Sequence, residues 1–236
     1  MSEQAALVWR VHEDVDACGR ALGEAVARDL RAALEGGATG TLALSGGSTP
    51  RPFLEHLTTQ ELDWARVEIY LVDERWCDHD EARSNHGMIA RALSGGGARE
   101  ARLAPLWRPG HTLAEGGALA AAEVAAVAPL DVLVLGMGED GHTASWIPGA
   151  EGLDVALDDA IAPVVPVVPT DGREPRLTMS RCAVTSAKIR YLHLTGAAKR
   201  RVLEQAITPG PWEELPIRAA FAGTPLRVYW SPGGAR

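Results

Sequence analysis

Apolar positions along the chain follow two alternating spacings, one helical and one typical of buried strands. From Asp14 to Glu35 apolar residues recur every three or four positions, and two glycines follow, so we predict an amphipathic helix there. The next run, residues 41–45, is short and apolar and ends in glycines, as a buried parallel strand would. Pro50 suits the first turn of a following helix, where its missing N–H costs nothing.

The same alternation continues to the end of the chain. We predict strands at residues 67–72, 131–135, 189–194 and 226–230, and helices at residues 85–92, 112–128 and 197–206. Asn85 is expected to cap the first of these helices, and Thr112 with Glu115 to form a capping box for the second. Strands separated by helices of this length predict an α/β fold with a mostly parallel central sheet flanked by helices.

One region breaks this rhythm. Five prolines lie between residues 148 and 176, so this segment is expected to be loop or edge strand. The stretch "RLTMSRCAV" that follows alternates apolar and polar residues, which predicts a half-exposed strand, antiparallel to its neighbours. We therefore expect a small additional β-containing region beside the main sheet.

Composition limits the classes of protein that the chain can belong to. With 236 residues, 46% hydrophobic and 23% charged, the chain is expected to form one domain over residues 1–236. It has no apolar run of membrane-span length and no signal-peptide pattern, so we expect a cytoplasmic protein without membrane contact. The net charge of -8 opposes binding to nucleic acid. Three cysteines without a C-x-x-C pair predict buried thiols.

Three polar stretches follow predicted strands, and ligands of open parallel sheets bind beyond the carboxyl ends of the strands. We expect residues 45–49, 73–75 and 136–145 to converge there. In the first stretch, two glycines permit close backbone approach and two hydroxyls precede a helix, an arrangement that suits a phosphate group. Its residues are Ser45, Gly46, Gly47, Ser48 and Thr49. An ordinary tight turn would also use glycine and serine, so that alternative stays open.

The second stretch places Asp73, Glu74 and Arg75 at the end of a strand. A surface ion pair is the simplest alternative interpretation. A metal site through the nearby cysteine and histidines has no zinc or facial-triad spacing to support it, and His79 is expected to line or close a polar cleft.

The third stretch, "LGMGEDGHTASWIPG", contains a formal G-x-G-x-x-G after a strand. A dinucleotide fingerprint needs a long helix next, and Pro148 follows too soon for one. His142 follows Asp140 on this glycine-rich loop, where an imidazole can accept a proton near neutral pH. A purely structural histidine is the competing interpretation.

Three further cations are candidates for binding an anion. Lys199 begins a predicted helix, where a positive charge is unfavourable unless an anion lies nearby. Arg173 and Arg176 precede or begin the "RLTM" strand, and Arg176 is preferred because the strand restrains it.

The stretches "LALSGGSTP", "VDERW…DHDEARSN", "LGMGEDGHTASWIPG", "PRLTMS" and "GAAKRRVL" resemble, in order and spacing, those of the 6-phosphogluconolactonases. The resemblance covers nearly the whole chain. It implies a Rossmann-like fold shared with glucosamine-6-phosphate deaminases and ribose-5-phosphate isomerases. It also implies hydrolysis of the sugar phosphate 6-phospho-D-glucono-1,5-lactone in the oxidative pentose phosphate pathway, with no cofactor and no metal.

Carried over by position, the resemblance makes His142 the general base for water, with Asp140 beside it and Asp73 and Arg75 lining the same pocket. The partner of the oxyanion stays open between Arg75 and a loop N–H. The resemblance makes the 45–49 turn, Arg176 and Lys199 the phosphate cradle. Trp146 and Ile147 stand where the family more often has Leu and Phe, a departure that concerns local packing.

Three alternative functions compete with this one. Glucosamine-6-phosphate deaminases resemble "GHIAFNEP" at the third motif, with a glutamate five residues after the histidine, whereas this chain has Ile147. A sugar-phosphate sensor would carry a DNA-binding helix-turn-helix, which the sequence does not show. A dehydrogenase would require tight binding of NAD(P). Nothing in the sequence demands an assembly, so we expect a monomer.

Overall fold

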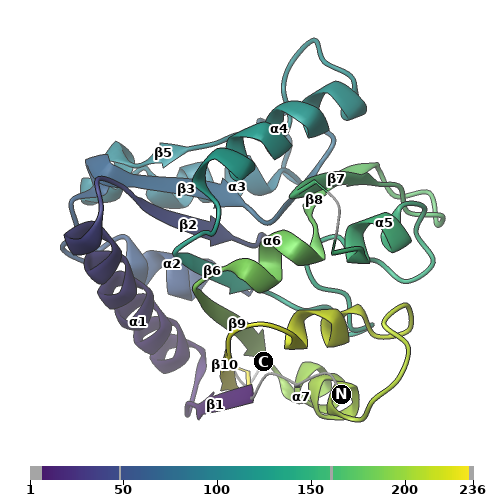
Figure 1. Cartoon of the computed structure of the whole chain (residues 1–236). Helices are drawn as coiled ribbons and strands as arrows, with labels where there is room; N and C mark the ends of the chain where they lie inside the picture. Colours follow the sequence, from purple (N-terminus) through teal and green to yellow (C-terminus); the bar gives the residue numbers. More distant parts are fainter. Residues whose placement is uncertain (1–6, 48, 160–161, 234–236) are drawn as a thin grey trace.

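The computed structural model describes residues 7–47, 49–159 and 162–233. Its centre is a sheet of parallel strands in the order β1-β10-β9-β6-β2-β3-β5 (Figure 1). The strands are β1 (Leu7–Val11), β2 (Gly40–Leu44), β3 (Val67–Leu71), β5 (Arg102–Leu103), β6 (Val132–Leu135), β9 (Ile189–Thr195) and β10 (Leu226–Ser231). The predicted α/β fold with a mostly parallel sheet is therefore confirmed.

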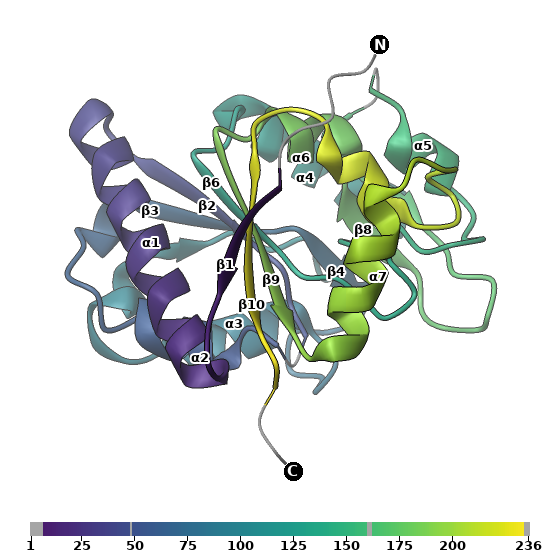
Figure 2. The ribbon, with the colours of Figure 1, turned by 90° about the horizontal axis from the view of Figure 1, so that it is seen from below.

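Helices cover both faces of this sheet. On one side α1 (Val15–Gly36) packs against α2 (Arg51–Leu57), and α3 (Asn85–Leu93) packs on α2. On the other side lie α4 (Leu113–Val127), α6 (Arg181–Ser186) and α7 (Ala197–Ile207), as the view from below shows (Figure 2). The short helix α5 (Leu153–Leu157) and three 3-10 helices, Trp64–Arg66, Gly96–Glu100 and Pro216–Phe221, lie in the connections.

A second, antiparallel sheet has the order β4-β8-β7 and consists of β4 (Asp73–Arg75), β8 (Arg176–Met179) and β7 (Val164–Val167). β7 carries Pro166 and lies at the edge, as the proline content of the region predicted. The antiparallel direction of β8 is confirmed, but its predicted half-exposure is wrong, because all four of its residues are buried. The strand lies between β4 and β7, and α4 packs against it.

Local signals predicted most elements of the main sheet correctly. α1 and α4 occupy the predicted segments, and α4 begins with the capping box of Thr112 and Glu115. The predicted cap of α3 is wrong: Ser84 Oγ, not Asn85, accepts the hydrogen bond from Gly87 N at 3.0 Å. That leaves the Asn85 side chain available for contacts in the pocket. The edge strands β1 and β5 and the helix α5 were not predicted, and α6 occupies residues that were expected to continue the strand at β8.

The order of the strands creates a crevice beside β2. From β2 the chain continues outward to β3 and β5, and it then returns to β6 on the opposite side of β2. Connections therefore diverge from neighbouring carboxyl ends, which is where open α/β sheets bind ligands. β2 and β6 are buried along their whole length, so they form a rigid floor for the loops that follow them. No helix in the described part of the chain is long and apolar enough to cross a membrane.

Candidate active site

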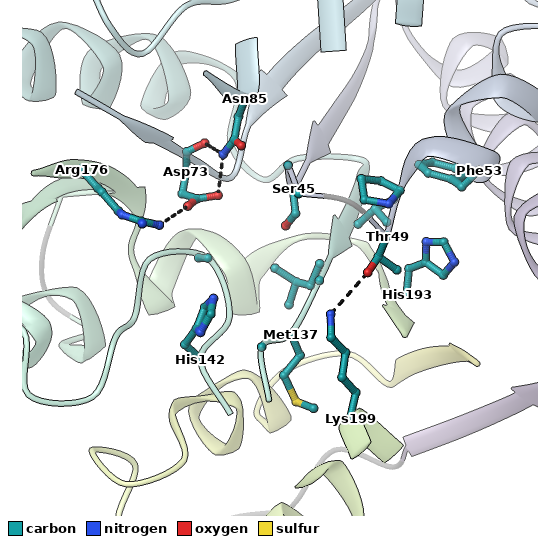
Figure 3. Close-up of a pocket in the computed structure, with 18 of the residues that line it drawn as sticks. Ser45, Thr49, Phe53, Asp73, Asn85, Met137, His142, Arg176, His193 and Lys199 are labelled. Atoms are coloured by element: carbon teal, nitrogen blue, oxygen red, sulfur yellow. Dashed lines mark hydrogen bonds and ion pairs between the residues drawn. The ribbon is translucent and has the colours of Figure 1, made fainter. Parts of the chain in front are cut away.

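A pocket of about 200 Å³ opens at the carboxyl ends of β2, β6 and β9 (Figure 3). All three polar stretches reach it, which confirms their predicted convergence. Its walls include the predicted site residues Ser45, Gly46, Gly47, Thr49, Asp73, Arg75, His142, Arg176 and Lys199. Asp140 does not line the pocket but contacts His142. The predicted contribution of Ser48 lies outside the described residues.

The first loop continues β2 and requires glycine at two positions. Ser45 N donates to Val134 O at 3.0 Å, which keeps the loop in line with the sheet. A Cβ on Gly46 would lie 1.9 Å from Asn85 Oδ1, so only glycine fits against that side chain. Gly47 has φ +97°, a conformation that side chains disfavour. These glycines therefore bring the backbone close to the pocket, as the sequence indicated.

Lys199 and Thr49 form one side of the pocket. Lys199 Nζ donates a hydrogen bond to Thr49 Oγ1 at 3.3 Å, and burial lowers the pKa of this lysine. The helix behind the loop offers fewer donors than expected, because α2 has seven residues and prolines stand at positions 50 and 52. The ammonium group of Lys199 is therefore the main positive charge on this side.

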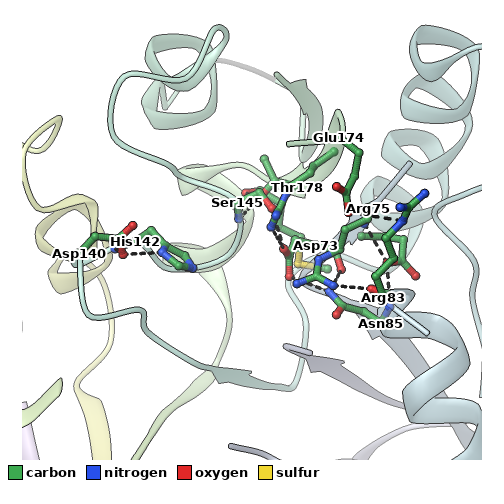
Figure 4. A network of polar contacts seen from close by, with 12 residues as sticks. Asp73, Arg75, Arg83, Asn85, Asp140, His142, Ser145, Glu174 and Thr178 are labelled. Atoms are coloured by element: carbon green, nitrogen blue, oxygen red, sulfur yellow. Dashed lines mark hydrogen bonds and ion pairs between the residues drawn. The ribbon is translucent and has the colours of Figure 1, made fainter. Parts of the chain in front are cut away.

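The His142 ring is held by Asp140 (Figure 4). The His142 Nδ1 to Asp140 Oδ1 distance is 2.5 Å, and His142 N also donates to Asp140 Oδ1 at 3.2 Å. This hydrogen bond lowers the pKa of Asp140 to about 2, so the carboxylate is ionised at neutral pH. Because the ionised carboxylate accepts a hydrogen bond from Nδ1–H, Nε2 is the basic nitrogen of the neutral ring. A Cβ on Gly138 would lie 2.3 Å from the ring, so glycine there is needed to accommodate it.

Asp73 lies on the opposite wall, 6% exposed, in a network that sequence reasoning did not foresee (Figure 4). Ser145 Oγ donates to Asp73 Oδ2 at 2.6 Å, and Asn85 Nδ2 donates to Asp73 O at 2.9 Å. Arg176 Nη1 lies 3.9 Å from Asp73 Oδ2. The Asp73 carboxylate, at the start of β4, therefore links the loop after β6 to β8, while its negative charge stays paired.

Glu74 points away from the pocket and supports its wall from behind. Its carboxylate accepts hydrogen bonds from three backbone N–H groups, those of Arg75, Asn85 and His86, and from Ser84 Oγ, all at 2.7–2.9 Å. It is 1% exposed, and burial raises its pKa while the four donors oppose the shift. Glu74 therefore joins β4 to the start of α3, which positions Asn85.

Replacing Glu74 with alanine is expected to destabilise the protein by about 3 kcal/mol or more, because each buried donor left without a partner costs about 1–3 kcal/mol. Urea unfolding of both proteins measures the difference. Glu81→Ala is the matched control, since Glu81 pairs with Arg83 at the surface and should change stability by less than about 1 kcal/mol. Equal losses in the two variants would contradict the role given to Glu74.

The arginines Arg75, Arg173 and Arg176 differ in their positions relative to the pocket. Arg176 is 6% exposed and lies on the Asp73 side of the pocket, across from Lys199, so these two members of the predicted cradle do not adjoin (Figure 3). Burial is the main cause of its lowered pKa. Arg75 lines the same wall and donates through Nη1 to Arg83 O. Arg173 pairs with Asp171 at the surface, which agrees with the preference for Arg176.

Polar atoms without partners gather around the pocket. Buried atoms that make no hydrogen bond there are Ser45 Oγ, Arg75 Nε, Arg176 Nε and both ring nitrogens of His193. Buried polar groups in folded proteins are nearly always paired, so a cluster of unpaired ones indicates a site that a polar ligand or water completes. His193 is a pocket residue that the sequence did not reveal, because it lies within an apolar strand pattern.

The histidines near β4 have a different environment from the one expected. His79 does not line the pocket; its ring stacks on His86 with centroids 3.8 Å apart and meets Trp107 edge-on. Within residues 7–47, 49–159 and 162–233, no group of three metal-ligating side chains comes together. After β6 the chain forms a long loop before the five-residue α5, which lacks the long helix of a dinucleotide site.

The fold and pocket define an α/β protein with a polar crevice at the carboxyl ends of a parallel sheet, in which a carboxylate-oriented histidine and a half-buried lysine line the same space. The chain belongs to the glucosamine-6-phosphate isomerase/6-phosphogluconolactonase family, whose model matches residues 13–230.

Relatives in this family match almost the whole chain. A 6-phosphogluconolactonase from Rhizobium meliloti is 42% identical, over 94% of this chain and 97% of its own length. Another from Pseudomonas putida is 40% identical, over 94% of this chain and 93% of its own. The crystal structure of a 6-phosphogluconolactonase from Shewanella baltica is 35% identical, with a TM-score of 0.90 over 95% of this chain and 97% of that one.

Proposed function

We propose that this protein is a 6-phosphogluconolactonase, which hydrolyses 6-phospho-D-glucono-1,5-lactone to 6-phospho-D-gluconate in the pentose phosphate pathway. Relatives with that name, at up to 42% identity over 94% of the chain, support the assignment. The observation that carries it is chemical: one pocket has a base, His142 with Asp140, and a separate cation, Lys199 on Thr49. A phosphorylated lactone needs both.

His142 acts on the water that attacks the lactone. Its Nε2 takes a proton from the water as the oxygen bonds to C1 of the lactone, and Asp140 stabilises the imidazolium that forms. The imidazolium of His142 then gives this proton to the ring oxygen of the lactone, which leaves C1 when the C1–O bond breaks. The overall reaction adds one water and needs no other reactant, so the protein needs only to position and exchange one proton.

The Asp73 wall stabilises the charge that develops on the carbonyl oxygen. As water adds to C1, that oxygen becomes anionic, and fixed positive groups near it lower the barrier. Arg75 and Arg176 both line this wall and each has an unpaired Nε. We assign the oxyanion contact to this pair, and we place Arg176 with the reacting end because Asp73 holds it on that wall.

The other side of the pocket receives the phosphate group. Lys199, Thr49 and the backbone of Gly46 and Gly47 form this phosphate side, and an anion there offsets the burial of the lysine charge. Binding energy from the unreactive phosphate can hold C1 against the water. We further propose that residues 1–236 form one domain that acts as a monomer in the cytoplasm, without nucleic acid or a cofactor.

A deaminase function has less support from the site. The position of the deaminase glutamate holds Ile147, which is 4% exposed and belongs to the hydrophobic core. An apolar side chain cannot transfer the proton that ring opening requires.

The proposal is tested with freshly generated 6-phosphogluconolactone. At saturating lactone, the protein should accelerate acid release about 10⁶-fold over the spontaneous rate, without added metal or nucleotide. Acid release is followed by pH-stat titration, with heat-inactivated protein as the control. A rate equal to the spontaneous one, or ammonia release from glucosamine 6-phosphate, would overturn it.

A further inference from the structure

A buried histidine lies beside the phosphate side of the pocket. His193 belongs to β9, is 2% exposed and lines the pocket. Its ring meets Phe53 of α2 edge-on, with centroids 6.1 Å apart. In the close-up the imidazole lies next to Thr49, on the same side as Lys199 and away from His142 (Figure 3).

Neither nitrogen of this ring has a hydrogen-bond partner among the described residues. A neutral imidazole carries one N–H donor and one acceptor, and burying either without a partner is unfavourable. Leucine at this position would bury no polar group and would therefore cost less. A buried, unpaired polar ring that lines the pocket is thus suited to a ligand.

The charges around the ring determine which ligand it suits. Lys199 from α7 and His12 after β1 are the charged or titratable groups that act on it, and both are basic. Tyr229 of β10 is its register partner, and Phe53 of α2 is apolar. Burial, with these basic neighbours, lowers the pKa of His193 to about 4, so the ring is neutral at cellular pH. It can therefore donate one hydrogen bond to an anion without adding a charge.

We propose that His193 is a phosphate-binding residue, which donates an imidazole N–H to a substrate phosphate oxygen beside the Lys199 ammonium and the Thr49 hydroxyl. This inference rests on the proposed function in that the phosphate belongs to the lactone substrate. It makes the phosphate side of the pocket a combination of one charged donor and one neutral, rigid donor. The rigid ring restrains where the phosphate lies, because strand β9 and Phe53 hold it in place.

His193→Leu tests this assignment. We expect the KM for 6-phosphogluconolactone to rise about tenfold or more, as for loss of one hydrogen bond to a charged group, while kcat stays within about twofold. Unphosphorylated gluconolactone should be hydrolysed as by the wild type. The thermal unfolding midpoint should stay the same or rise, because the variant no longer buries unpaired nitrogens. His193→Gln, which retains an N–H donor, should recover part of the lost affinity.

His86→Leu is the matched control. His86 also has a buried nitrogen without a partner among the described residues, but its ring stacks on His79 and does not line the pocket. Its replacement should leave the KM unchanged. An equal rise of KM in both variants would overturn the role of His193. So would a loss of kcat/KM in His193→Leu that is the same for the phosphorylated and the unphosphorylated lactone.

A binding measurement separates this inference from the proposed function. Inorganic phosphate titrated into the wild type should bind and shift the ring-nitrogen resonances of His193 in histidine ¹⁵N spectra, and His193→Leu should bind it about tenfold more weakly. If the wild type binds phosphate in this way but does not hydrolyse the lactone, only the proposed function fails. If the protein hydrolyses the lactone, but the His193 resonances do not shift with phosphate and His193→Leu binds phosphate as tightly as the wild type, only the inference fails.

Discussion

His142→Ala is expected to lower kcat for 6-phosphogluconolactone by about 10²–10⁴, because positioned proton transfer contributes a factor of that size. The KM should change little, since the ring lies away from the Lys199 side that receives the phosphate (Figure 3). Stability should also change little, because the ring is partly exposed and Asp140 is the side chain that it contacts. Initial rates of acid release, corrected for spontaneous hydrolysis, measure the effect.

Two further variants make this experiment specific. Asp140→Asn removes the charge that orients the ring and stabilises its protonated form, so it should lower kcat by a smaller factor than His142→Ala. His111→Ala is the matched control, because His111 is exposed, does not line the pocket and forms a hydrogen bond with Pro109 O. A His142→Ala variant as active as His111→Ala would rule out His142 as the base.

Lys199→Met should change which substrates the enzyme prefers. Loss of a charged donor to phosphate is expected to lower kcat/KM for the phosphorylated lactone about tenfold to a hundredfold. Methionine keeps the length and apolar part of the side chain, so packing is largely retained. Activity on unphosphorylated gluconolactone should stay near that of the wild type, and the ratio of the two kcat/KM values measures the effect.

The chain provides a close control for this substitution. Its sequence has one other lysine, Lys188, which pairs with Asp131 at 2.7 Å before the start of β9, at the opposite edge of the sheet. Lys188→Met removes the same charge but lies outside the pocket. Equal effects of the two substitutions would show that net charge matters and not contact with phosphate.

Some residues of the pocket can be predicted from the local sequence and others cannot. Gly46, Gly47 and His142 were found because glycines beside reactive groups at strand ends form a local pattern. Asn85 was predicted to cap a helix, and this prediction is wrong. The sequence cannot show that the Asn85 side chain lies against Gly46. His193 carried no signal, since a histidine in an apolar strand looks like a core residue until the pocket beside it is known.

The sequence by itself determined helices α1 to α4 and α7, the central strands, the parallel sheet and the convergence of three loops, because periodicity, capping and turn residues act within a few positions. It did not reveal β1, which pairs with β10 from the other end of the chain. Nor did it reveal the buried position of β8 or the place of Arg176 beside Asp73. The pairing of β1 with β10, of β4 with β8 and of Asp73 with Arg176 joins residues more than 100 positions apart in the sequence. Only the packed tertiary structure brings such segments together, and it therefore decided which wall of the pocket each charge occupies.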